Sequence, residues 1–146
     1  MVKLIISGHG EISTGIVSAV NMIFGENDNV IAVPFKKGEG LEDIKKHYES
    51  ALKNYPTEEG ILFLVDLFGG SPYNAAIQLA YGDENIDIVT GVNLPMVLEA
   101  LGMAETSSLK ELVDHLKESV PESFKIFSEQ TQQLANQEDN EEDDLL

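Results

Sequence analysis

The chain has 146 residues, 42% of them hydrophobic and 24% charged, a length and composition that suit one compact α/β domain. Its formal net charge of −17 argues against nucleic-acid binding, because such a field repels phosphate backbones. It contains no cysteine for disulfides or thiolate metal sites and no apolar run of roughly 20 residues for a membrane span, so we expect a cytoplasmic protein.

Short apolar runs that predict strands alternate along the chain with stretches whose apolar residues recur at helical spacing. The strands are predicted at residues 3–7, 29–35, 61–65 and 86–90. The helices are predicted at residues 12–24, 41–55, 71–82, 95–101 and 108–120. Ser71 with Pro72 is the expected start of the third helix, and Ser108 with Glu111 predicts a capping box for the fifth. This order predicts an α/β fold with a doubly wound, mostly parallel sheet in the flavodoxin-like order 2-1-3-4.

Two further segments follow the predicted helices. Residues 124–127 (Phe-Lys-Ile-Phe) lie beyond the helix-stopping Pro121 and predict a last short strand. Residues 129–146 hold seven acidic residues and no lysine, a composition typical of a disordered tail or a truncated linker. We therefore divide the chain into a domain over residues 1–128 and an acidic tail over residues 129–146.

The ends of the first and third strands are where a doubly wound sheet of this order binds ligands. His9 follows the first strand between Gly8 and Gly10, and Asp66 follows the third. If these strands are neighbours, both side chains emerge at the same edge of the sheet. A carboxylate that accepts a hydrogen bond from one imidazole nitrogen fixes the tautomer and leaves the other nitrogen as a nucleophile.

A glycine-rich turn follows Asp66 and completes the predicted site. Gly69, Gly70 and Ser71 would present free backbone N–H groups at a helix N-terminus, which suits phosphate oxygens. Each feature alone has an ordinary structural explanation as a turn or a cap, and only their joint placement favours a phosphoryl-accepting histidine. His47 and His115 are expected to be solvated, and no residue spacing suggests a metal site.

Three sequence blocks, at residues 6–10, 63–72 and 90–96, occur in an order and spacing that resemble a known family. It is the enzyme IIA component of the mannose family of the bacterial phosphoenolpyruvate-dependent sugar phosphotransferase system, and the similarity runs from residue 1 to about 127. The resemblance implies a phosphotransferase with a phosphohistidine intermediate on His9. It also implies that Asp66 holds the other ring nitrogen and that Gly69, Gly70 and Ser71 hold the phosphoryl group, without a cofactor.

The resemblance also implies a set of partners. Family members accept the phosphoryl group from the phosphocarrier HPr and pass it to a IIB component, which phosphorylates a sugar entering through the IIC and IID membrane subunits. They form homodimers that exchange a C-terminal antiparallel strand, a role that residues 124–127 could fill here. The chain is similar to a separate cytoplasmic IIA subunit that meets the membrane through the IIC/IID complex.

Other functions stay open on the sequence alone. The phosphotransfer subunit of a dihydroxyacetone kinase has similar motifs. A non-catalytic regulatory dimer of the same fold would not need His9 and Asp66 together. A receiver domain would need an acidic pair after the first strand, where Glu11 stands alone.

Overall fold

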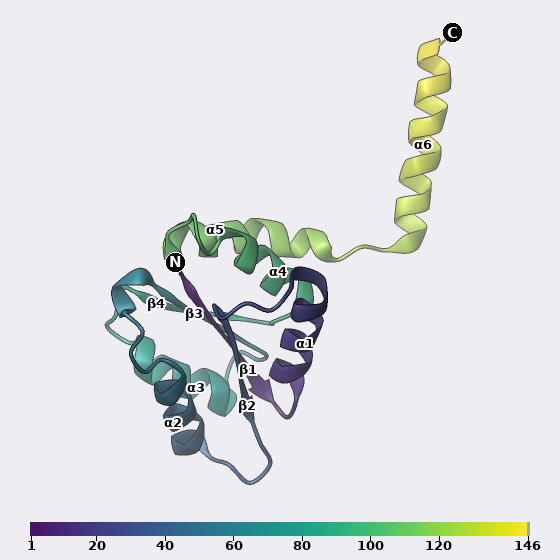
Figure 1. Ribbon diagram of the computed structural model, residues 1–146. Helices are drawn as coiled ribbons and strands as arrows, with labels where there is room; N and C mark the ends of the chain where they lie inside the picture. Colours follow the sequence, from purple (N-terminus) through teal and green to yellow (C-terminus); the bar gives the residue numbers. More distant parts are fainter. Residues whose placement is uncertain (146) are drawn as a thin grey trace.

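The computed structural model describes residues 1–145, with the side chains of residues 1–138. Its centre is a parallel four-stranded sheet in the order β2-β1-β3-β4, which confirms the predicted α/β class and strand order (Figure 1). The strands are β1 (Lys3–His9), β2 (Val30–Phe35), β3 (Ile61–Val65) and β4 (Ile86–Thr90). The helices are α1 (Ile12–Phe24), α2 (Leu41–Ala51), α3 (Gly70–Ala80), α4 (Leu94–Met103), α5 (Leu109–Ser119) and α6 (Phe127–Leu145), with short 3-10 helices at η1 (Thr57–Glu59) and η2 (Val120–Ser123).

Helices cover both faces of the sheet, and two apolar clusters form the core. Side chains of β1 alternate between the clusters: Leu4 and Ile6 pack with α1, α4 and α5, whereas Ile5 packs with α2 and α3. Figure 1 shows these two groups of helices on opposite sides of the sheet. All five residues of β3 are buried, and each such apolar side chain contributes about 1.5–3 kcal/mol to folding.

Two predicted caps have different outcomes. The capping box of α5 is confirmed, because the Ser108 hydroxyl accepts from the Glu111 amide at 3.1 Å and the Glu111 carboxylate accepts from the Ser108 amide at 3.3 Å. The prediction that Ser71 caps α3 is wrong, since Gly69 is the N-cap and the helix begins at Gly70. These two glycines have φ angles of 106° and 79°, a left-handed backbone that starts the helix earlier.

The C-terminal segment also differs from the sequence prediction. In the single chain residues 124–126 form no strand, since the segment leads away from the domain and Phe124 is 79% exposed (Figure 1). Exchange of this segment as a strand between two copies stays a prediction. Residues 127–145 form α6 in place of the predicted disordered tail. They contain no glycine or proline and many glutamine and glutamate residues, which favour a helix without tertiary packing. Leu146 lies outside the described residues, and the boundary at residue 128 stays a prediction.

Candidate functional site

The structure brings His9 and Asp66 together at the C-terminal edge of the sheet. His9 ends β1 and Asp66 follows β3, the strand beside it. One oxygen of Asp66, Oδ2, lies 2.8 Å from His9 Nδ1 and also accepts the His9 backbone N–H at 2.9 Å. Gly8 makes this approach possible, because a Cβ there would lie 2.8 Å from Asp66 Cγ and 2.5 Å from Ile12 Cγ2.

The carboxylate and the imidazole differ in their exposure to solvent. The side chain of Asp66 is 11% exposed and that of His9 is 48% exposed. Burial alone would raise the pKa of Asp66, but hydrogen bonds from the His9 amide and ring outweigh it and lower the pKa. Asp66 is therefore a carboxylate at neutral pH and accepts the proton of Nδ1–H. The lone pair of the His9 ring is then on Nε2, the nitrogen that does not contact Asp66.

The N-terminus of α3 lies beside this free nitrogen. A Cβ on Gly70 would stand 3.4 Å from His9 Cε1 and 3.7 Å from Nε2, so the glycine backbone lies against the ring. Gly69 and Ser71 flank Gly70 at the start of α3. The first amides of a helix have no partner within it and carry partial positive charge, which suits an anion bound to Nε2.

Phe35 is a neighbour of the site that the sequence analysis did not select. It ends β2 in register with His9, and the two rings are 5.6 Å apart between centroids at an interplanar angle of 85°. An apolar loop also follows Asp66, where Leu67 is 57% exposed and Phe68 is 81% exposed. The sequence signal for this loop is a pair of large apolar residues between a strand end and a glycine turn.

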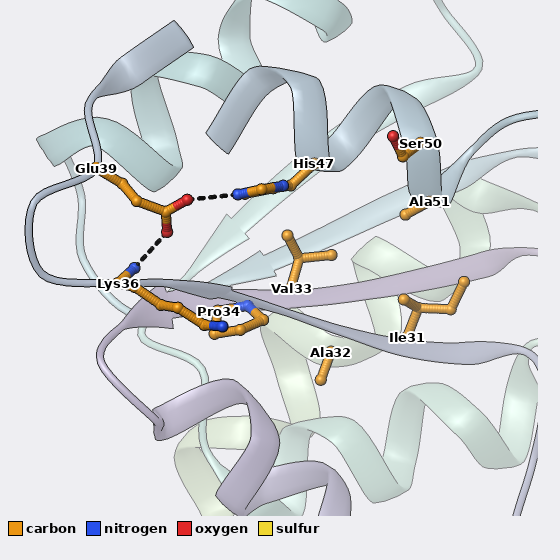
Figure 2. A pocket seen from close by; sticks show the side chains of 9 residues that line it. All are labelled: Ile31, Ala32, Val33, Pro34, Lys36, Glu39, His47, Ser50 and Ala51. Atoms are coloured by element: carbon orange, nitrogen blue, oxygen red, sulfur yellow. Dashed lines mark hydrogen bonds and ion pairs between the residues drawn. The ribbon is translucent and has the colours of Figure 1, made fainter. Parts of the chain in front are cut away.

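Each of the other two histidines is paired with a glutamate rather than with Asp66. His47 Nε2 contacts Glu39 Oε2 at 2.5 Å in a cavity of about 360 Å³ between β2 and α2 (Figure 2). His115 Nε2 contacts Glu99 Oε2 at 2.9 Å. Both imidazoles were expected to be solvated. They are partly exposed, but each has a carboxylate partner. Among residues 1–145, none of the helices has the length and apolar character to span a bilayer.

The chain is similar over most of its length to several known proteins. A family model described as "PTS system fructose IIA component" matches residues 3–117. The PTS system fructose-specific EIIA component of Bacillus subtilis is 46% identical, with 99% of this chain and 100% of the relative covered. The PTS system mannose-specific EIIAB component of Escherichia coli K12 is 34% identical over 86% of this chain and 39% of its own length. The crystal structure of phosphotransferase system component EIIA from Streptococcus agalactiae superposes with a TM-score of 0.78 at 32% identity, covering 88% of this chain and 98% of that one.

Proposed function

Since the chain belongs to the family of EIIA components of the sugar phosphotransferase system, we propose that it carries the phosphoryl group on Nε2 of His9. HPr would be the donor, and a IIB component would be the acceptor that leads to the IIC and IID membrane subunits. The observation that carries this proposal is the 2.8 Å contact between His9 Nδ1 and Asp66, which leaves Nε2 as the free nitrogen beside Gly70.

The transfer step follows from this arrangement. The Nε2 lone pair attacks the phosphorus of the donor's phosphohistidine, a new P–N bond forms, and the electron pair of the broken P–N bond stays on the donor ring. The His9 ring becomes more cationic as the bond forms, while Nδ1 keeps its proton. The Asp66 carboxylate stabilises that developing charge without taking the proton. Transfer to the acceptor repeats the step in reverse.

The chemistry needs positioning more than driving force, because similar P–N bonds are broken and formed. The backbone amides of Gly69, Gly70 and Ser71 would hold the phosphoryl oxygens at the start of α3. The chain contains no arginine that could hold the phosphoryl oxygens by two parallel bonds, so the proposal assigns this contact to the neutral backbone donors. Weak neutral contacts favour a phosphoryl group that is readily passed on.

The proposal is tested by incubating the protein with phosphoenolpyruvate, enzyme I and HPr, followed by intact-mass measurement. We expect one acid-labile phosphoryl group on the wild type and none on His9→Ala. His47→Ala and His115→Ala are matched controls, since both histidines also contact a carboxylate, and both should be labelled fully. Full labelling of His9→Ala would overturn the proposal.

The acceptor separates this function from its alternatives. The matched relatives are named as components of sugar phosphotransferase systems, which favours a IIB acceptor over a dihydroxyacetone kinase. The phosphorylated protein should pass its label to a purified IIB component and not to a kinase subunit. A regulatory dimer without catalysis would not become labelled at all.

We also propose that two copies associate through the edge of β4. This strand pairs only with β3 among the described strands, and a groove of about 380 Å³ lies between it and the residues of α5 and η2. Residues 124–127 of a second copy would supply the missing strand, since Phe124 and Phe127 are 79% and 83% exposed in the single chain.

The length of the C-terminal truncation separates this dimer from association through the acidic helix. Removal of residues 129–146 should leave a dimer by light scattering at micromolar concentration, whereas removal of residues 122–146 should shift the mass toward the monomer. A monomeric full-length protein under the same conditions would contradict the proposal.

A further inference from the structure

The imidazole of His9 has a third neighbour besides Asp66 and Gly70. Phe35 and His9 end adjacent strands at the same register position, and both side chains lie on the face of the sheet that packs with α2. Their rings meet edge to face, with centroids 5.6 Å apart and planes at 85°, the arrangement that aromatic pairs favour. The Phe35 ring is therefore in contact with the proposed nucleophile.

The backbone around Phe35 is held on both sides. Its carbonyl accepts the Gly10 amide at 2.9 Å, directly after His9. The next amide, that of Lys36, donates to Glu39 Oε1 at 2.7 Å, and the other Glu39 oxygen contacts His47 on α2 (Figure 2). Phe35 therefore sits between two anchored points and has little freedom to move away from His9.

His9 needs such a neighbour because its own restraints are few. The side chain is 48% exposed, and one side-chain hydrogen bond, to Asp66, holds the ring. The terminal torsion of a histidine is broad, so a single bond at Nδ1 is a weak restraint on the ring. A half-turn would place Cδ2 where Nδ1 lies and Cε1 where Nε2 lies, and the bond to Asp66 would be lost. A displacement of about 1 Å at a reacting atom can cost 10²-fold in rate, so the direction of Nε2 matters.

We propose that Phe35 is a positioning residue for His9. Its ring blocks rotation of the imidazole away from Asp66 and keeps Nε2 directed toward Gly70. The inference rests on the proposed role of His9 as phosphoryl carrier, but the positioning itself is a property of the unphosphorylated protein. It can therefore be measured without any transfer.

The test compares Phe35→Leu with Phe35→Tyr, which keeps the aromatic ring. Ile31→Ala is the matched control, because it removes apolar packing from the same face of β2, opposite Ile5 rather than His9. Long-range ¹H–¹⁵N spectra of the histidine rings report the tautomer. We expect one Nδ1–H tautomer for His9 in the wild type, Phe35→Tyr and Ile31→Ala, and a mixture or exchange broadening in Phe35→Leu.

Transfer from phospho-HPr gives the second readout. The rate should fall roughly 3- to 10-fold in Phe35→Leu and stay at the wild-type level in Phe35→Tyr and Ile31→Ala. A Phe35→Leu protein with the wild-type tautomer and rate would overturn the inference, and Phe35→Met serves for the same comparison if Phe35→Leu does not fold. Failure of the proposed function would look different, since the wild type itself would then take no label while the tautomer spectra would still report on Phe35.

Discussion

Replacement of Asp66 by asparagine isolates the charge of the carboxylate from its shape. Asp66 Oδ2 accepts both the His9 amide and the His9 ring at 2.9 and 2.8 Å. An asparagine oxygen can still accept the backbone N–H, so the turn should survive. The neutral amide no longer stabilises the cationic ring, and its NH₂ group can face the ring and favour the wrong tautomer.

The expected loss follows from these contacts. Hydrogen bonds to a charged group contribute about 1.5–3 kcal/mol each, and the ring also loses the opposite charge beside it. Together these terms correspond to about 3–5 kcal/mol in the transition state, or a transfer rate roughly 10²- to 10⁴-fold lower.

Rapid-quench measurement of transfer from phospho-HPr is the assay for Asp66→Asn, with circular dichroism to establish that the variant is folded. Asp83→Asn is the matched control, because Asp83 also accepts a backbone amide in a turn, that of Asn85 at 2.9 Å, away from His9. We expect the control to react like the wild type. If Asp66→Asn folds normally and also reacts at the wild-type rate, Asp66 is only a turn residue and the mechanism is wrong.

Three further predictions concern the same edge of the sheet. The pKa of Asp66 is below its ordinary value of 3.8, so its charge should stabilise the fold fully above about pH 5, and this stabilisation should be lost as the pH falls through the lowered pKa. The difference in unfolding free energy between wild type and Asp66→Asn should become smaller over the same fall in pH. Gly8→Ala should lower stability by about 1–3 kcal/mol in thermal unfolding, because its Cβ would overlap Ile12 and Asp66, whereas Gly15→Ala in α1, with open space around it, should not destabilise. Phe68→Ser should change the unfolding free energy by no more than about 0.5 kcal/mol, since the side chain is 81% exposed. If Phe68 helps HPr to dock, the variant should slow transfer from phospho-HPr but not from a small phosphoryl donor, and equal slowing with both donors would argue against this role.

The pairing of His9 with Asp66 was accessible from the sequence because it depends only on strand order. Continuous apolar strands predict a parallel sheet, and the carboxyl ends of neighbouring parallel strands meet at one edge. Phe35 was not accessible in the same way. Its contact with His9 depends on the register between β1 and β2, and a shift of one residue would turn its side chain to the other face.

The start of α3 and the C-terminal helix show two other limits of sequence patterns. Ser71 has the residue type of an N-cap, but the left-handed φ angles of Gly69 and Gly70 let the helix begin earlier in the chain, at Gly70. Residues 127–145 lack the apolar content that tertiary packing needs, which favoured disorder. The helix over these residues is favoured instead by local helix propensity and by the absence of glycine and proline, which outweigh the lack of apolar packing.

The central claim is that Nε2 of His9 carries the phosphoryl group while Asp66 holds Nδ1. The most direct test is the one-bond ³¹P–¹⁵N coupling in protein labelled with ¹⁵N-histidine and phosphorylated through enzyme I and HPr. We predict a single coupling, to Nε2 of His9, with Nδ1 still protonated. A coupling to Nδ1 of His9, or to a nitrogen of His47 or His115, would contradict the account.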